Sequence, residues 1–197
     1  ILSSVVPPLN STILQAVEKI LGKKPLLVGS GMKTGLNILM DNPKTVGSDM
    51  IVDAVAAIHE YPKPIIVIDM GTATTMSVVD KQGNYIGGVI LPGLKVSLDS
   101  LSGKTAQLPY ISLSTPDKVI GKNTIDCMRS GIIYGNAAQI DGIMDRMEAE
   151  LGEPASAVAT GGLAKFITPL CRHHVVYDDA LLLKGLLILY RKNTQHH

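Results

Sequence analysis

The sequence predicts a mixed α/β fold, because short runs of branched apolar residues are interspersed with longer segments of helical periodicity. The chain has 197 residues, which is enough to bury a core in one large domain or two small ones. Hydrophobic residues make up 46% of it and charged residues 18%, and this composition argues against a disordered chain. The net charge of +1 gives no overall field that would attract nucleic acid or an anionic membrane.

The first third of the chain is expected to alternate strands and helices. Residues 1–6 are rich in branched side chains and precede two prolines that would end a strand. Apolar residues in steps of three and one give residues 49–61 one apolar face, which is typical of a helix. The expected elements are a strand at 1–6, a helix from Asn10 or Ser11 to Gly22, a strand at 25–30, a glycine-rich loop and a helix at 49–61.

The rest of the chain is expected to begin with strands and to end with helices. Residues 65–69 are a fully apolar run that ends in a carboxylate, which predicts a buried strand. The elements expected after it are strands at 76–80 and 85–91 around a turn, a helix at 93–101, an irregular stretch at 103–117, a helix at 124–150, a strand at 156–159, a helix after Gly162 and a last helix from Asp178 or Asp179.

Cysteine content and hydropathy indicate the setting of the protein. Cys127 and Cys171 have no zinc-type spacing and do not make a disulfide framework, so a reducing cytoplasm is the simplest expectation. No apolar run reaches the length of about 18 residues that a membrane span needs. The chain begins at Ile1 inside an apolar stretch, which we interpret as a strand entered midway and hence as a fragment. His196 and His197 at the other end are assigned no function.

The segment 68–75, with the sequence IDMGTATT, is the strongest candidate for a ligand site. A buried strand delivers Asp69 to its carboxyl end, and Gly71 lets the backbone turn sharply and approach a ligand. The threonines that follow add hydroxyls beside backbone N–H groups, an arrangement that can hold phosphate oxygens, while Asp69 can hold a cation. The alternative is a plain Gly-Thr turn. The segment is not a Walker A loop, because no Gly-Lys-Ser/Thr sequence follows.

Asp49 stands at the start of the helix predicted for residues 49–61, within the sequence VGSDM. One interpretation is a helix cap, since a carboxylate is stabilised at the positive end of a helix. The other is a general base that orients a substrate hydroxyl and accepts its proton late in a phosphoryl transfer. The two interpretations are compatible, although the helix end makes this carboxylate a weak base.

Two further segments bring glycines to the end of a strand, GGVILPG at 87–93 and ATGG at 159–162. Gly161 and Gly162 would open a helix at a point where a phosphate or a flat base lies close to the backbone. Plain turns are the alternative for both segments. The two adjacent histidines lack a paired carboxylate in the sequence, and nothing marks a cysteine as a nucleophile. No site role is therefore expected for His59, Cys127, His173 or His174.

These segments, in this order, resemble the type III pantothenate kinase family of the acetate kinase, sugar kinase, heat-shock chaperone and actin superfamily. The resemblance extends over nearly the whole chain, and it is specific because many short motifs follow one another. The motifs are SSVVP (3–7), GMKTGLNI (31–38), DNPKTVGSD (41–49), DMGTATT (69–75), GGVILPG (87–93), TAQLP (105–109), GKNT (121–124), GIIYG (131–135), ATGG (159–162) and LLLKGL (181–186).

The resemblance implies an α/β, actin-like (ribonuclease H-like) two-domain fold that forms a homodimer in the cytoplasm. Residues 1–63 would be the remainder of the first domain, whose amino-terminal part is missing, and residues 64–197 the second domain. The implied activity is ATP-dependent phosphorylation of pantothenate, the first step of coenzyme A biosynthesis. The implied cofactors are ATP, a monovalent cation (K⁺ or NH₄⁺) and Mg²⁺, with no nucleic acid or membrane as partner.

The same resemblance implies roles for individual residues. Asp49 is expected to be the catalytic base beside the pantothenate hydroxyl, and Asp69 to bind the monovalent cation. The residues expected around pantothenate are Gly47, Ser48, Met40, Met50 and, supplied by the partner subunit, Thr124. The residues expected around ATP are Gly71 and Thr72 at the phosphates and Gly161 and Gly162 near the nucleotide.

Three departures from the family pattern bear on activity. The family opens with an Asp-x-Gly-Asn-Thr phosphate loop, which we expect upstream of Ile1 and without which the fragment would bind ATP poorly. The residue after the catalytic aspartate is usually an arginine suited to the pantothenate carboxylate, and here it is Met50. Met40 replaces a tyrosine that commonly precedes the Asp-Asn-Pro run. A non-catalytic relative that binds nucleotide or a pantothenate-like ligand, and a kinase for a substrate without a carboxylate, remain alternatives.

Overall fold

The structure, a computed structural model, describes residues 1–195 of the chain. His196 and His197 lie outside the described residues. Within the described range, a six-stranded sheet forms the centre of the molecule. Its strands are β1 (Asn37–Ile38), β2 (Ile65–Met70), β3 (Ala73–Val79), β4 (Asn84–Pro92), β5 (Ser156–Thr160) and β6 (Val175–Tyr177). Across the sheet they follow the order β1-β4-β3-β2-β5-β6.

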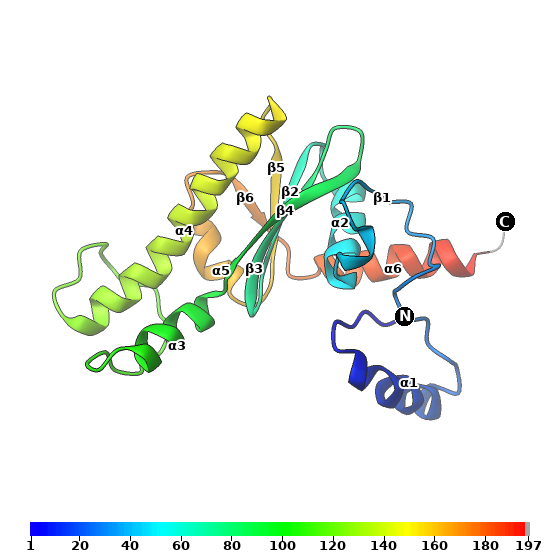
Figure 1. Cartoon of the computed structure of the whole chain (residues 1–197), viewed down its shortest axis with the longest axis horizontal. Helices are drawn as coiled ribbons and strands as arrows, with labels where there is room; N and C mark the ends of the chain where they lie inside the picture. Colours follow the sequence, from blue (N-terminus) through cyan, green and yellow to red (C-terminus); the bar gives the residue numbers. More distant parts are fainter. Residues whose placement is uncertain (196–197) are drawn as a thin grey trace.

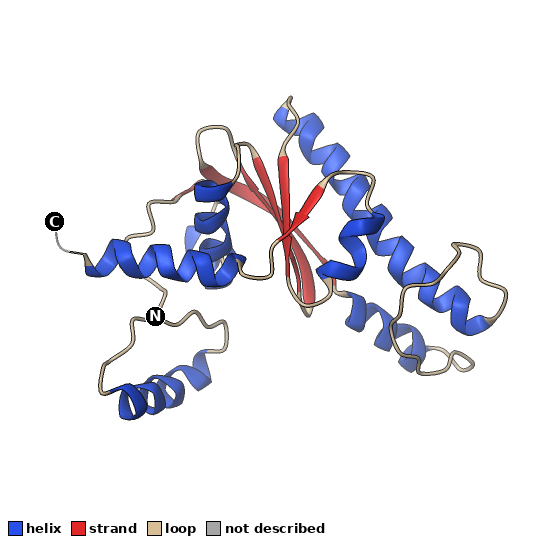
Figure 2. Ribbon diagram, turned by 180° about the vertical axis from the view of Figure 1, so that it is seen from behind, coloured by secondary structure: helices blue, strands red, loops and turns tan. Residues whose placement is uncertain are grey.

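Helices cover both faces of this sheet. The covering helices are α2 (Ser48–Glu60), α3 (Leu94–Lys104), α4 (Thr124–Leu151), α5 (Ala164–Ile167) and α6 (Leu181–Thr194). α1 (Pro7–Leu21) lies outside these layers, and 3₁₀ turns occur at Pro43–Thr45 and Thr168–Leu170. α3, α4 and α5 lie on one face, and α2 and α6 lie on the other (Figure 1). The view from behind shows the same three layers, with the strands between two groups of helices (Figure 2). The predicted mixed α/β fold is confirmed.

Strand direction decides which strand ends meet at one edge of the sheet. β3 is antiparallel to both β2 and β4, whereas β5 runs parallel to β2 and β6 runs parallel to β5. β1 pairs in parallel with β4. β2 and β5 therefore end at the same edge, although β3, β4, α3 and α4 lie between them in the sequence. The turns that follow these two strands are neighbours in space.

β2 is buried on both of its faces. Ile65, Ile66 and Ile68 have 0% of their surface exposed. Because side chains alternate along a strand, Ile66 and Ile68 pack with α4, while Ile65 packs with α2. This explains why the strand has an uninterrupted apolar sequence up to Asp69, its only charged residue.

α2 is fixed between the sheet and the last helix. α6 approaches it closely at Gly185, where a Cβ atom would lie 2.1 Å from the carbonyl oxygen of Val52. Beside this contact, Lys184 forms ion pairs of 2.7 Å with both Glu60 and Asp178. These contacts hold α2 against α6, while the alanines of α2 pack with Ile65 and Val67 of β2.

The amino-terminal segment differs from the expectation. The predicted strands at 1–6 and 25–30 amount to a single parallel bridge between Leu2 and Leu27, since no further strand among residues 1–195 pairs with them to extend a sheet. The helix begins at Pro7 and not at Asn10 or Ser11, because proline suits the first helical turn, where its missing N–H is not needed. α1 buries none of its residues and lies apart from the sheet (Figure 1).

The remaining elements lie close to their predicted positions, with three differences. The last helix begins at Leu181, because the Asp178 carboxylate accepts the Ala180 N–H in a turn that precedes it. The helix after Gly162 has only four residues. The short strands β1 and β6 were not predicted, since two or three residues carry no periodicity.

No helix of residues 1–195 combines the length and the apolar character required to cross a bilayer.

Candidate functional site

Asp69 lies at the carboxyl end of β2, in the middle of the sheet. Its register partners are Thr75 on β3 and Thr160 on β5. The alternation along β2 points its side chain to the face that α2 covers, the same face as Ile65 and Val67. The carboxylate is half-buried, because the chain turns away from the sheet directly after it.

The turn between β2 and β3 is held against the start of α3. The Gly71 N–H donates to the carbonyl of Ala73 at 3.0 Å, and the Gly93 N–H donates to the carbonyl of Thr72 at 3.2 Å. A Cβ atom at Gly93 would lie 2.3 Å from the Thr72 oxygen and 2.5 Å from the Gly71 oxygen, so only glycine fits. Gly71 and Thr72 themselves are exposed and accessible to a ligand.

The turn after β5 lies against the end of β2. Gly161 has a φ of +95°, and a Cβ atom there would lie 2.6 Å from the carbonyl oxygen of Met70. Both the backbone conformation and the close contact require glycine. Gly162 is exposed and has open space where a side chain would be. The fold therefore brings the predicted glycine segments at Gly71, Gly93 and Gly161 to one edge of the sheet.

Asp49 lies in the first turn of α2, where Gly47 occupies the N-cap position. Its Oδ1 accepts the N–H of Met50 at 2.9 Å, and a Cβ atom at Gly47 would lie 2.4 Å from this oxygen. The structure thus assigns the N-cap to Gly47 rather than to Asp49. Ser48 holds the amino-terminal segment, with its Oγ 2.9 Å from Ser3 Oγ and 3.2 Å from the Ser4 carbonyl.

Asp49 and Asp69 belong to one electrostatic environment. Burial raises the pKa of the Asp69 carboxyl, and the charge of Asp49 raises it further. Asp53, one helical turn after Asp49, is only 3% exposed. Burial, together with the charges of Asp69, Asp49 and Asp178, raises the pKa of Asp53 to about 8. Three carboxyl groups therefore share the region between α2 and the end of β2.

Sequence reasoning missed Asp53. It lies within the apolar pattern that predicts α2, so it was counted as one residue of a helix and not as a site residue. The signal that identifies it is its spacing from Asp49, because residues four apart lie on the same side of a helix.

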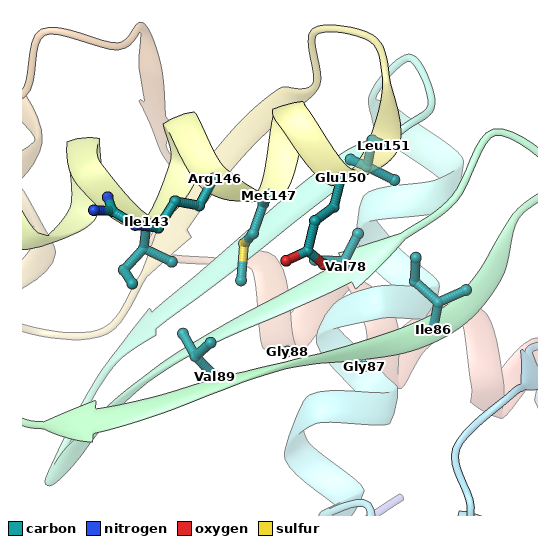
Figure 3. Close-up of a pocket in the computed structure, with 10 residues that line it drawn as sticks. All are labelled: Val78, Ile86, Gly87, Gly88, Val89, Ile143, Arg146, Met147, Glu150 and Leu151. Carbon is teal, nitrogen blue, oxygen red and sulfur yellow. The ribbon is translucent and has the colours of Figure 1, made fainter.

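A hollow of about 340 Å³ lies on the opposite face of the sheet, between β4 and the second half of α4 (Figure 3). Apolar side chains form its floor, and Arg146 and Glu150 stand at its rim. The first half of the predicted segment GGVILPG lines it, at residues 87–89, whereas none of the residues expected around pantothenate, ATP or the cation does. The candidate site is instead the solvent-open edge where the turns after β2 and β5 meet.

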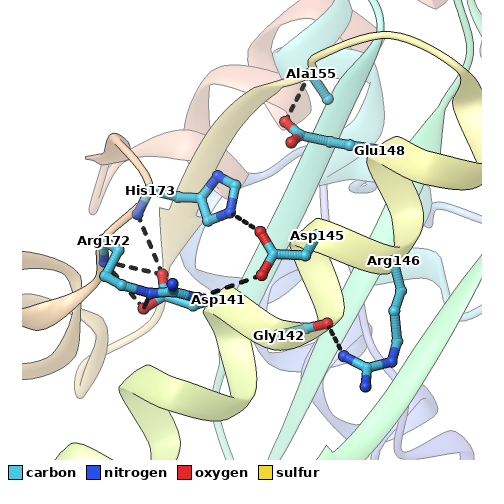
Figure 4. Close-up of polar contacts among 8 residues, drawn as sticks. All are labelled: Asp141, Gly142, Asp145, Arg146, Glu148, Ala155, Arg172 and His173. Carbon is cyan, nitrogen blue, oxygen red and sulfur yellow. Dashed lines mark hydrogen bonds and ion pairs between the residues drawn. The ribbon is translucent and has the colours of Figure 1, made fainter.

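A second cluster of polar residues joins α4 to the segment before β6 (Figure 4). Asp141 accepts the backbone N–H of Arg172 at 2.9 Å and that of His173 at 3.1 Å. Asp145 pairs with Arg172 at 3.2 Å, and its Oδ1 lies 2.7 Å from His173 Nε2. His173 thus has a carboxylate partner after all, although one distant in the sequence. Each carboxylate is satisfied here, so the cluster holds two elements together.

A model of the type III pantothenate kinase family matches residues 1–146. The chain belongs to the type III pantothenate kinase family. The matched range includes the predicted site residues from Met40 to Thr124, and it ends before Gly161 and Gly162. The resemblance stated from the sequence is therefore confirmed.

Solved structures with a similar fold are distant in sequence. One, from Campylobacter jejuni, is described as a "conserved putative Baf family transcriptional activator". It is 20% identical and aligns with a TM-score of 0.57 over 90% of this chain and 88% of that chain, which shows a shared fold. The Alp12 filament structure is 12% identical over 72% of this chain and 51% of that chain, and its TM-score of 0.49 supports no inference.

The positions at which this chain departs from the pantothenate kinase pattern lie on the α2 side of the sheet. Met40 and Met50 are half-buried and pack against the core formed by α2 and β2. The Met40 sulfur would lie 3.6 Å from a Cβ atom at Gly87. Neither side chain carries charge. Thr124 lies elsewhere, exposed at the first turn of α4 on the other face of the sheet, so one chain does not bring it to Asp49 (Figure 1).

The residues at this edge fit the groups that the kinase family implies. Carboxylates suit a cation, and the Asp53 Oδ1 is buried without a hydrogen-bond partner among the described residues. Exposed backbone at Gly71, Thr72 and Gly162 suits phosphate. No three or more His, Cys, Asp or Glu residues of the described range are grouped so as to hold a metal ion. These residues therefore suit a cation that binds with few protein carboxylates among its ligands.

Proposed function

We propose that the protein phosphorylates pantothenate with ATP. The observation that carries the proposal is the match to the type III pantothenate kinase family over residues 1–146, which include Asp49 at the start of α2 and Asp69 at the end of β2. The charge of Asp49 also acts on Asp69 and raises its pKa. The start of α2 and the end of β2 thus share one environment, beside turns whose glycines approach the backbone of β2. A helix-starting aspartate next to a phosphate-binding turn suits transfer of a phosphoryl group to a hydroxyl.

Each residue of the site has a distinct role in this proposal. Asp49 orients the pantothenate hydroxyl and accepts its proton as the phosphoryl group arrives. Gly47 and Ser48 line the pantothenate side. Thr72 contacts the ATP phosphates through its N–H and hydroxyl groups, and Gly71, whose N–H donates to the Ala73 carbonyl, lets the phosphates approach the turn closely. Gly161 and Gly162 lie along the nucleotide. Two observations support these predicted roles: the family match, and the close contact between the turn after β5 and the end of β2.

The ions complete the charge balance at the phosphates. The monovalent cation, K⁺ or NH₄⁺, takes the Asp69 carboxylate among its ligands. Mg²⁺ binds through the ATP phosphates and water, with at most one or two carboxylates, which agrees with its ordinary coordination in kinases. These ions supply positive charge next to the transferred group, and the protein residues orient the two substrates.

The proposal extends to fold and assembly. The strand order, with β3 antiparallel to its neighbours and β5 and β6 parallel to β2, supports an actin-like (ribonuclease H-like) arrangement. We assign residues 1–63 to a first domain and 64–197 to a second. In a homodimer, Thr124 of one subunit would reach the pantothenate site of the other. A cytoplasmic location follows from the metabolic role.

Pantothenate-dependent ATP turnover tests the function. The protein encoded by the complete gene is assayed with and without pantothenate, in potassium chloride and in choline chloride of equal ionic strength. We expect turnover only with pantothenate, and faster turnover with potassium. Absence of pantothenate-dependent turnover contradicts the proposal. Turnover with an uncharged hydroxylated compound, and none with pantothenate, would support kinase activity and contradict pantothenate as the substrate.

Met50→Arg tests how the substrate carboxylate is recognised. A charge-assisted hydrogen bond contributes about 1.5–3 kcal/mol, so the KM for pantothenate is expected to fall about tenfold or more. Met50→Gln is the matched control, because it has polar atoms and no charge. An unchanged KM in Met50→Arg would show that the carboxylate binds elsewhere.

A further inference from the structure

Asp53 is a buried carboxyl group that has no internal partner for one of its oxygens. The residue is 3% exposed, and its Oδ1 has no hydrogen-bond partner among residues 1–195. A buried polar atom without a partner is costly, and native proteins usually satisfy such atoms with a protein group, a water or an ion. The middle of α2 therefore contains an acceptor that the described chain leaves unused.

Every charged group that acts on Asp53 has the same sign. These groups are Asp69, Asp49 and Asp178, and all three are carboxylates. Lys184, the basic side chain that contacts Asp178, is already paired with both Asp178 and Glu60 at 2.7 Å. Asp53 is the buried member of this set, and a buried carboxyl group beside like charges is stable only if a proton or an added cation neutralises it.

The donors around this group suit a monovalent cation. No arrangement of three or more His, Cys, Asp or Glu residues for a metal ion occurs in residues 1–195, whereas the usual divalent sites require several such ligands. The threonines that flank Asp69 in register, Thr75 and Thr160, offer neutral hydroxyl oxygens on the same face of the sheet. Two carboxylates and neutral oxygens suit a singly charged ion.

We propose that Asp53 is a second protein ligand of the monovalent cation and holds it together with Asp69. This inference rests on the proposed function, which supplies the monovalent cation and its ligand Asp69. Asp53 approaches from α2 and Asp69 from β2, so the bound ion joins the helix that carries Asp49 to the strand that leads into the phosphate turn. The cation then fixes the distance between the two halves of the site as well as balancing charge.

Thermal unfolding in different salts tests this role without an activity assay. The melting temperature is measured while potassium chloride replaces choline chloride at constant ionic strength. We expect a saturable rise in the wild type with potassium. In Asp53→Asn, which keeps the shape and replaces the carboxyl group by an amide that cannot ionise, we expect the half-saturating potassium concentration to rise about tenfold or more, the effect of losing a charge-assisted contact to the bound ion. Asp99→Asn, an exposed change on α3, should behave as the wild type.

Two results overturn the cation site. One is an equal response to potassium in the wild type and in Asp53→Asn. The other is a melting temperature of the wild type that is the same in potassium chloride and in choline chloride. That result means that a proton, and not potassium, neutralises Asp53 and Asp69. Should Asp53→Asn not fold, Asp53→Glu, which keeps the carboxyl group and displaces it, is compared with the wild type in the same potassium titration and by thallium(I) NMR. An unchanged half-saturating concentration and an unchanged thallium signal in Asp53→Glu then overturn the site.

Failure of the cation site is distinguishable from failure of the proposed function. If the protein phosphorylates pantothenate, and potassium raises the melting temperature of the wild type and of Asp53→Asn equally, only the cation site is overturned. An Asp53-dependent potassium response without any pantothenate-dependent turnover supports the cation site and overturns the proposed substrate.

Discussion

The two faces of the sheet each carry a group of aspartates, and the groups differ in how their charges are satisfied. On the α4 face, Asp141 accepts two backbone N–H groups and Asp145 pairs with Arg172 and His173. On the α2 face, Asp53 has an oxygen without a partner, and the charges that act on it are all negative. Satisfied carboxylates join elements of the fold, whereas unsatisfied ones indicate where a ligand or an ion is needed.

The largest expected effect is that of Asp49→Asn on turnover. A positioned general base contributes about 10²–10⁴-fold, so kcat for pantothenate phosphorylation should fall by about that factor. The amide keeps the size of the side chain, so circular dichroism and the melting temperature should change little. Undiminished turnover in Asp49→Asn would remove Asp49 from the mechanism.

Substitution by alanine should reduce stability far more at Gly161, in the turn after β5, than at Gly131 on α4. Gly161→Ala requires a strained φ and contact with the Met70 carbonyl, so the free energy of unfolding should fall by about 1–3 kcal/mol. Gly131→Ala is the matched control, because open space surrounds Gly131 and alanine favours a helix by about 1 kcal/mol. Urea denaturation measures both. Equal midpoints for the two variants would contradict the packing of Gly161 on β2.

The α4 cluster should affect stability and leave ligand binding unchanged. Asp141→Ala leaves the backbone N–H groups of Arg172 and His173 without an acceptor, which costs about 1–3 kcal/mol. The affinity for ATP should stay as in the wild type, provided that it is measured below the melting temperature. A selective loss of ATP affinity would instead assign a ligand to this cluster.

The smallest effect concerns Asp145 in acid. The hydrogen bond to His173, together with the charges of His173 and Arg172, lowers the pKa of Asp145 below its usual 3.8. A carboxyl whose folded-state pKa is lowered adds stability above its usual pKa, and this is lost as the pH falls through the folded value. The wild type should therefore lose slightly more stability than Asp145→Asn on acidification below that range. Parallel pH curves would show that the pair contributes nothing.

The strongly periodic and the deeply buried elements could be predicted from the sequence. α2, α4 and β2 to β5 lie within a few residues of their expected ranges, because burial imposes a clear apolar pattern on each. The prediction of strands at 1–6 and 25–30 was wrong, since the branched residues there form only one bridge and strand formation depends on neighbours that lie elsewhere in the chain. The start of α1 at Pro7 was missed because capping by Asn10 or Ser11 was preferred over proline in the first turn.

The candidate site was predicted in its parts and not in its arrangement. An aspartate at the start of a helix suggested Asp49, and aspartate and glycine at strand ends suggested Asp69 and the turn glycines. The parallel pairing of β2 with β5, which brings Gly161 onto Met70, depends on long-range contacts that a single sequence does not reveal. Asp53 was hidden because a carboxyl inside an apolar helix face is recognised only when its partners, or their absence, are known.

The most direct test of the account is where the ligands bind. Backbone amide chemical shifts are recorded for the protein before and after addition of a non-hydrolysable ATP analogue with magnesium, and then of pantothenate. The account predicts that the largest changes fall at Gly47 to Asp49, at Gly71 and Thr72 and at Gly161 and Gly162, with little change at Arg172 and His173. Changes confined to the α4 cluster or to the hollow beside β4 would contradict it.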